Sequence, residues 1–454
     1  MAAMEKNLYT GSSTSVLYTD RRDFYLPNDV KELWSDTAPF LTAVANNNQF
    51  KPKDPLFKMF EYRNYWVDQR FSVTSGTLGD GSVADGGEDT ITLPASTTTN
   101  TIGIGHGSNG SLRGSYLVGL VCAIHANDPA TSKPTGDRKG TVLITSYTGD
   151  TSIGVKLLAA TGSAVPTIVD GDWFVVIGNA HGEGSESPEP WADELKVVWG
   201  SCQIFRTPLQ ITKTLMEAAL RGEPNELIRL RRIKSMEHKM QRERTFLFGA
   251  SVLGNNLGYA DTFGDSSLID ADGEKVRTTT GLHEAIIKYG SATGDDQNIF
   301  NINQASYTYA NFVDDCEKIF QYQPLEGSKQ MWASAKMLSF WSKMESTSGF
   351  AKNSGWTVNI GDVSKDKLGF NYRMLDTPHG MIQLVPTPAL TISPYNGEGI
   401  ITDVSNLRHA VYEEDAYHQN IKTDNAPLIQ KDEYYSYDGL GIQLIPTHKI
   451  MRLV

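Results

Sequence analysis

The chain has 454 residues, of which 39% are hydrophobic and 21% are charged, and its formal net charge is −12. Such a chain is expected to fold, and its length predicts two or three folding units. The longest apolar run, Tyr116 to Ile124, is too short for a bilayer-spanning helix. The three cysteines lie far apart without a CxxC pair, which excludes a disulfide scaffold and indicates buried free thiols.

The first part of the chain is expected to be an arm followed by a loop. Residues 1 to about 55 mix isolated hydrophobic residues with polar turns, and a helix predicted from Asn28 to Ala45 is interrupted by Pro39. An extended aromatic strand from Leu56 to Phe71 then leads into a loop rich in glycine and aspartate.

A β-rich block follows between Ile91 and Gly184. Turn residues separate four predicted strands, at 116–124, 141–147, 152–159 and 173–177. Strands that are so short and so closely spaced predict a small barrel or sandwich inserted in a host domain. A further strand is predicted from Leu195 to Phe205, directly before a long helix.

The long helix is predicted from Pro224, a residue that suits a first helical turn, to Phe248. About 25 residues at roughly 1.5 Å each make a rod of nearly 40 Å, about twice the usual helix length. A narrow apolar stripe is expected to lie on a sheet or a partner. Its members are Leu227, Leu230, Ile233, Met240 and Leu247.

The rest of this helix is charged, with eight basic and four acidic residues between Arg221 and Arg244. One interpretation is a solvated helix with pairs such as Lys239 and Glu243. A second is a basic strut that meets acidic surfaces of neighbouring copies of the chain. Binding of nucleic acid is disfavoured by a sequence pI near 5.3. The candidate interface residues are Arg229, Arg231, Arg232, Lys234, Lys239 and Arg242.

The remainder of the chain predicts a mixed α+β domain after a loop at 255–280. Helices are expected at 281–289, 307–320 and 328–344, and strands at 356–360, 370–375 and 381–385. The stretch from Glu433 to Leu453 is expected to be strand-like with a glycine turn.

No catalytic, cofactor or metal motif is present in the sequence. The spacing of Gly105, Gly107 and Gly110 fits a dinucleotide loop, but a strand follows instead of a helix. Asp270 and Asp272 predict a turn, because the rest of a calcium loop is out of register. The nine histidines show no metal-ligand spacing, so no cofactor is expected. A pair of carboxylates brought together by folding is the one catalytic alternative left open.

Several stretches, in this order, resemble the major capsid protein of tailed double-stranded-DNA bacteriophages, in a branch with an inserted β module. They are FEY at 60–62 before the glycine-rich loop, GEGSESPEP from Gly182, WGSCQIF, TPLQITKT, KSMEHKMQRERTFLFG, LDTPHGMIQLVP, ITDVSNLRHAVY and DEYYSYDGLGIQLIPTHK. Each match alone has low specificity, and the resemblance rests on their order over nearly the whole chain.

The resemblance implies an α+β capsid fold divided into named parts. These are an N-terminal arm (1–55), an extended loop (56–95), an inserted β-rich module (96–190), a peripheral domain (191–280) with a spine helix at 224–248, an axial domain (281–400), and a return to the peripheral domain with a closing strand (401–454).

The resemblance also implies a structural protein, with no enzymatic activity, that forms hexamers and pentamers of an icosahedral head. Its implied partners are other copies of itself, a portal vertex, a scaffold protein, decoration proteins and, by weak non-specific contact, the packaged DNA. It would be found in the virion after assembly in the host cytoplasm. The alternatives are an encapsulin-like shell that encloses enzymes, and a carboxylate-dependent hydrolase. A short arm at the start of the chain favours a separate scaffold protein.

Overall fold

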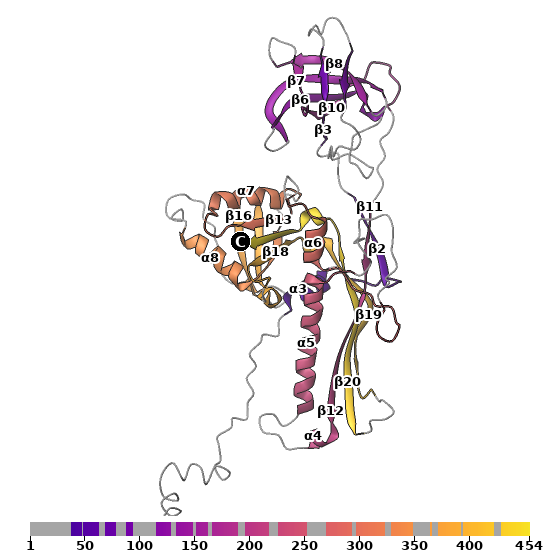
Figure 1. The fold of residues 1–454 in the computed structure, drawn as a ribbon, viewed down its shortest axis with the longest axis vertical. Coiled ribbons are helices and arrows are strands. Elements are labelled where there is room, and N and C mark those ends of the chain that lie inside the picture. Colours follow the sequence, from indigo (N-terminus) through magenta and orange to yellow (C-terminus); the bar gives the residue numbers. More distant parts are fainter. Residues whose placement is uncertain are drawn as a thin grey trace, which may run out of the picture. The chain divides into compact units, whose positions relative to one another are not determined.

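The computed structural model describes most of the chain, in two compact units (Figure 1). One unit comprises Met1–Lys58 with Trp199–Val454, and the other comprises Met59–Val198. The described residues are 38–47, 49–62, 69–78, 88–93, 115–128, 133–148, 151–161, 166–188, 196–217, 226–251, 269–292, 297–322, 328–347, 364–365, 371–391, 394–421 and 428–454. No helix in these ranges is long and apolar enough to cross a membrane.

The smaller unit is built on one eight-stranded antiparallel sheet. Its strands, in spatial order, are β3 (Arg70–Ser72), β10 (Trp173–Asn179), β6 (Leu120–Asp128), β7 (Lys133–Thr148), β8 (Ser152–Ala160), β5 (Asp89–Thr92), β4 (Ser75–Thr77) and β9 (Thr167–Ile168). The strands at 70–92, within the range expected for an extended loop, therefore pair with strands of the β-rich block.

This sheet curves around a single apolar core, as a small barrel does. Phe71 from one end of the strand order and Ile168 from the other lie in the same buried cluster. Val73 donates its backbone N–H to the Asp172 carbonyl at 2.8 Å and accepts from Gly171 at 2.9 Å, which ties the two ends together. The strands predicted at 152–159 and 173–177 are confirmed, and the one at 141–147 is the second half of a longer β7. The strand predicted at 116–124 begins later than expected, because Ser115–Leu117 form a 3-10 turn and β6 begins at Leu120.

The larger unit contains a four-stranded sheet with one long helix against it. The spatial order is β1 (Gln49–Phe50), β19 (Leu407–His418), β20 (Ile429–Ile442) and β12 (Gln203–Thr212). Helix α5 (Glu226–Phe248) runs along β12 and β20 (Figure 1). The helix predicted at 224–248 is confirmed from Glu226 onward, and residues 224–225 lie outside the described residues. The strand predicted at 195–205 is two strands, because Cys202 separates β11 (Lys196–Ser201), which pairs with β2 (Leu56–Glu61), from β12.

A seven-stranded mixed sheet forms the rest of this unit. Its order is β13 (Ile299–Ile302), β21 (Lys449–Leu453), β18 (Glu398–Thr402), β14 (Ser328–Ala333), β17 (Gly380–Pro386), β16 (Asn371–Thr377) and β15 (Ser364–Lys365). Helices α7 (Tyr309–Phe320) and α8 (Ala335–Thr347) pack on it through a buried cluster that includes Phe312 and Trp341, 4.7 Å apart between ring centroids. The predicted mixed α+β character of this region is confirmed.

Two expectations for local structure are wrong. Residues 328–333 form a central strand instead of the start of a helix, because β14 lies between β17 and β18 and buries Met331 and Trp332. Pro39 is the first residue of helix α3 (Pro39–Asn47), so the helix predicted from Asn28 to Ala45 is confirmed from the proline onward; residues 28–37, and with them the predicted interruption, lie outside the described residues. The strand predicted at 356–360 also lies outside them.

The glycine turn expected between Glu433 and Leu453 is also wrong, because β20 continues through Gly439 and Gly441. An added Cβ on Gly439 would lie 2.4 Å from the Ser201 carbonyl oxygen, so glycine here permits a close backbone approach. The chain turns later, at Ile445–Thr447, where the preceding Leu444 has a φ of 50°.

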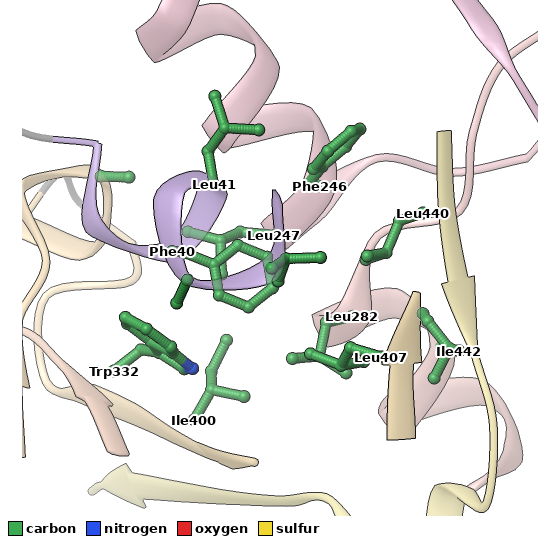
Figure 2. Close-up of a cluster of buried hydrophobic side chains, with 14 of the residues drawn as sticks. Phe40, Leu41, Phe246, Leu247, Leu282, Trp332, Ile400, Leu407, Leu440 and Ile442 are labelled. Carbon is green, nitrogen blue, oxygen red and sulfur yellow. The ribbon is translucent and has the colours of Figure 1, made fainter. Parts of the chain in front are cut away.

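One apolar core joins the two sheets of the larger unit (Figure 2). Phe40 and Leu41 come from α3, Phe246 and Leu247 from the end of α5, and Leu407 and Leu440 from the four-stranded sheet. Trp332 and Ile400 come from the seven-stranded sheet. The Phe40 and Trp332 rings meet edge to face at 5.1 Å, and the Trp332 indole donates to Thr402 Oγ1 at 2.9 Å. The carboxyl end of α5 is therefore anchored in this core.

Candidate assembly interface

The face of α5 that lies on the sheet is polar over most of its length. His238, Arg242 and Phe246 recur every four residues and are buried against β12 and β20. Of the apolar stripe predicted for this face, only Leu247 is fully buried; Leu227, Leu230, Ile233 and Met240 are half-buried. Within the protomer, hydrogen bonds and ion pairs therefore hold most of the helix to the sheet, and the alternative that the stripe lies on a partner stays a prediction.

Arg231 reaches across to the sheet, where it pairs with Asp432 on β20. Its guanidinium lies 2.8 Å from the carboxylate, which is fully buried, and 5.5 Å from the centre of the Tyr417 ring. Burial by itself raises the pKa of Asp432, but hydrogen bonds from the Asn420 backbone, the Tyr417 hydroxyl and Arg231 outweigh burial and lower this pKa to about 2. The pair is therefore ionised over the whole physiological range.

Arg242 makes the deepest ion pair of the helix. Its guanidinium hydrogen bonds to Asp438 on β20 and, at 2.8 Å, to Asp415 on β19. The side chains of Arg242 and Asp438 are 6% and 1% exposed, whereas that of Asp415 is 63% exposed. His409 also contacts Asp438, with its Nε2 atom 2.8 Å from the carboxylate. Burial lowers the pKa of Arg242, but the two carboxylates outweigh it, so the group stays charged.

His238 lies between the two strands under the helix. Its Nδ1 atom is 2.9 Å from the Thr207 hydroxyl on β12, and its Nε2 atom is 2.7 Å from the Ser436 hydroxyl on β20. Burial, and then the charge on Arg242, lower the pKa of His238, so the ring is neutral at pH 7. Both ring nitrogens therefore position the helix without adding a charge.

The other candidate residues lie on the remaining faces of α5. Arg229 pairs with Glu226, and Lys234 pairs with Glu237 at 2.7 Å, both within the helix. Arg232 and Lys239 are exposed. Glu243 is fully buried, so the pair with Lys239 suggested by their spacing is not formed. The six predicted residues thus divide into two that cross to the sheet, two paired along the helix, and two exposed to solvent.

The acidic partners on the strands were missed by sequence reasoning. Asp432 and Asp438 lie about 200 residues after the helix. One signal was available: Asp432, Tyr434, Ser436 and Asp438 alternate along β20, a spacing that places all four on one face of a strand. Tyr434 completes this face by donating its hydroxyl to the Arg231 carbonyl at 3.1 Å.

The end of α5 is fixed by a close backbone crossing. Gly281 donates its N–H to the Gly249 carbonyl at 2.6 Å, and a Cβ on Gly281 would lie 2.4 Å from the Gly249 nitrogen. Phe248 stacks on Tyr395 with ring centroids 3.9 Å apart. This crossing positions α5 against α6 (Leu282–Tyr289).

The described residues contain no group of three or more His, Cys, Asp or Glu side chains placed to hold a metal ion. Asp270 is instead the first residue of a turn, and its carboxylate accepts the backbone N–H groups of Asp272 and Glu274. The three cysteines are free and buried, as predicted, and burial raises the pKa of Cys122 to about 12.

Comparison with known proteins identifies a family. A capsid chain of a native GTA particle matches 95% of this chain and 95% of its own length, with 8% identity and a TM-score of 0.43. A chain of Mycobacterium phage Bobi matches 97% of this chain and 98% of its own length, with 8% identity and a TM-score of 0.41. The SrpI encapsulin of Synechococcus elongatus PCC 7942 is matched over 57% of this chain and 76% of its own (10% identity, TM-score 0.35). No curated protein matches the sequence. These structural likenesses are distant, and the assignment rests on a family model described as SU10 major capsid protein, which matches residues 26–427. The chain belongs to the SU10 major capsid protein family.

Proposed function

We propose that this major capsid protein assembles as hexamers and pentamers into the icosahedral head that encloses a double-stranded DNA genome. The family match carries the proposal, because residues 26–427 include nearly all of both compact units. A shell of this kind needs large repeated contacts between copies.

Within that proposal, the outward basic residues of α5 are contacts between subunits. Arg232 and Lys239 are exposed and project from a helix that the buried ion pairs of Arg231 and Arg242 fix to the sheet. A rigid support of this kind reduces the entropy lost when a charged side chain is ordered at an interface. Arg231 and Arg242 act inside the protomer, so they contribute to assembly by holding the helix in place.

The remaining partners follow from the same role. A portal vertex, a scaffold protein, decoration proteins and the packaged DNA are its proposed contacts, and the host cytoplasm is the proposed place of assembly. A net charge of −12 favours only weak adhesion to DNA. Tight binding of duplex DNA by empty shells at physiological salt would contradict that last point.

Electron microscopy of the purified full-length chain tests the main proposal. We expect closed particles under at least one assembly condition, with or without a co-expressed scaffold. Small discrete oligomers under every condition would overturn the proposal. Particles that enclose protein cargo would favour an encapsulin-like shell, and a small oligomer with hydrolytic activity would favour the enzyme alternative. Catalysis has no place in the structural role that we propose.

Charge reversal on α5 tests the interface. The variant Arg232→Glu/Lys239→Glu should keep the wild-type urea midpoint as an unassembled subunit and lose most of its yield of closed particles. Lys336→Glu, an exposed charge reversal on α8, is the control. Equal particle yields for the double variant and the wild type would exclude these two residues as subunit contacts.

A further inference from the structure

One side of the layer formed by α5 and the four-stranded sheet carries exposed charges of both signs. Within this layer, Gln241 contacts β12, whereas Arg242 reaches Asp415 of β19 on the other side of the helix. At about 100° per residue, Arg232 and Lys239 lie nearly opposite Gln241 and within about 80° of Arg242 around the helix. Both are exposed, so they form a basic row on the side of α5 that lies toward β19.

The strand β19 is acidic along the same side of the layer. Glu413, Glu414 and Asp415 are consecutive and exposed, and two shifts in the register of β19 against β20 lie on either side of Glu413. In the described part of the chain, β1 covers the other edge of β19 at His409 and Ala410, and no strand covers it beyond them. Because Asp415 already pairs with Arg242, we call Glu413 and Glu414 the acidic row.

This edge is unsuited to the addition of a strand from another chain. Bulges leave residues outside the regular ladder, and charged side chains on an edge strand prevent regular pairing of its backbone. A partner must therefore be held by side chains. The charges indicate its chemistry, because it has to present basic groups to β19 and acidic groups to α5 at the same time.

We propose that this side of the layer binds the same side of a second copy of the chain about a two-fold axis, with the basic row of each copy facing the acidic row of the other. The proposal rests on the shell function proposed above, and it names the partner of the basic residues of α5. A surface with one row of each sign is complementary to itself when the axis runs parallel to the rows, because the rotation places each row opposite the row of the other sign.

The charges of such a contact balance. Each copy contributes two cations and two carboxylates, so the paired surfaces carry no net charge. The ion pair of Arg242 with Asp415, at 2.8 Å, ties α5 to β19 and so fixes the spacing of the two rows before the copies meet. Rows that are fixed in this way lose little freedom on binding.

The two-fold symmetry also says which subunits meet here. Neighbours within a hexamer or a pentamer meet head to tail through two different surfaces, whereas a two-fold contact uses one surface twice. The α5–β19 side therefore joins subunits of different rings, and contacts within a ring use other surfaces.

Cross-linking of the wild-type protein tests the contact without any substitution. Unlabelled and heavy-isotope-labelled full-length chains are mixed in equal amounts before assembly and treated with a water-soluble carbodiimide, which joins a lysine to a carboxylate that it touches. Mass spectrometry should find Lys239 joined to Glu413 or Glu414, with the two peptides from differently labelled copies in the proportion expected for random pairing. Absence of this link, or links within single copies only, would overturn the proposal.

Exchange of the charges between the two rows provides a second test. Glu413→Lys/Glu414→Lys, like the double variant of α5, places like charges opposite one another and should lose most of its closed particles. The variant that combines both reversals restores opposite signs and should recover most of the wild-type yield. The matched control, Asp314→Lys/Glu317→Lys, makes the same change of net charge on exposed acids of α7 and should not rescue the variant of α5.

The outcomes separate this contact from the shell function. Wild-type particles together with a combined variant that does not recover, although its unassembled subunit keeps the wild-type urea midpoint, would overturn the contact and leave the shell function standing. Equal rescue by the α7 control would also overturn the contact, because net charge alone would then explain the recovery. If the wild type forms only small oligomers, the shell function fails, and the mixed-label link in those oligomers still decides the contact.

Discussion

Replacement of Arg242 by methionine should destabilise the subunit strongly. The guanidinium has one partner that is 1% exposed, Asp438, and one that is 63% exposed, Asp415. Loss of the exposed pair costs less than about 1 kcal/mol, whereas a buried carboxylate left without its cation costs roughly 3–5 kcal/mol. We therefore expect Arg242→Met to lower the free energy of unfolding by about 4 kcal/mol.

Urea denaturation of unassembled subunits, followed by tryptophan fluorescence, measures this loss. Arg244→Met is the matched control, because Arg244 is exposed two positions further along the same helix; its effect should stay within about 0.5 kcal/mol. The double variant Arg242→Met/Asp438→Asn should recover about 2 kcal/mol relative to the sum of the single variants, since it removes both buried charges together. Equal effects of the Arg242 and Arg244 variants, or strict additivity in the double variant, would refute a dominant buried pair.

Three further predictions concern other parts of the larger unit. Because the pKa of Asp432 is lowered from 3.8 to about 2, its ionisation stabilises the folded state by about 2 kcal/mol above pH 4, and this stability is lost as the pH falls toward 2. Asp432→Asn should therefore show a smaller loss of stability between pH 5 and pH 2.5 than the wild type, as measured by urea titration at the two pH values. Phe40→Ala should lower the free energy of unfolding by about 3–5 kcal/mol, because it opens a cavity beside Trp332. The control Phe60→Ala, at a side chain that is 62% exposed, should lower it by less than about 1 kcal/mol, and the urea midpoint measures both. Gly439→Ala should lower the melting temperature, at a cost of about 1–3 kcal/mol from its clash with the Ser201 carbonyl, while Gly136→Ala, with open space around it, should not.

Local signals in the sequence were enough to place α5. No residue between Glu226 and Phe248 breaks a helix, and its charge pattern excludes a fully buried position. The strands β8 and β10 were found for a similar reason, because turn residues flank short β-branched runs. Such signals depend only on neighbours along the chain.

The contacts of α5 could not be found in that way. An apolar stripe predicts the buried face only when the opposing surface is apolar, and β20 instead offers Asp432, Ser436 and Asp438. Glu243 is buried on a helix that contacts α3, about 200 residues earlier in the chain, so its spacing from Lys239 was misleading. The strand at 328–333 was missed because its neighbours β17 and β18 are about 50 and 70 residues away.

The place of β21 in the seven-stranded sheet has a consequence for the order of events during synthesis. This strand, Lys449–Leu453, pairs with β13 on one side and β18 on the other, so β13 has no strand partner in the sheet before residue 449 is made. When residues 299–402 have left the ribosome, the edge of β18 that later pairs with β21 therefore still has no strand partner. At about 5–20 residues per second, the roughly 50 residues between β18 and β21 keep that edge open for several seconds. During this time the unpaired edge of β18 can pair wrongly with other copies, and synthesis of β21 covers that edge.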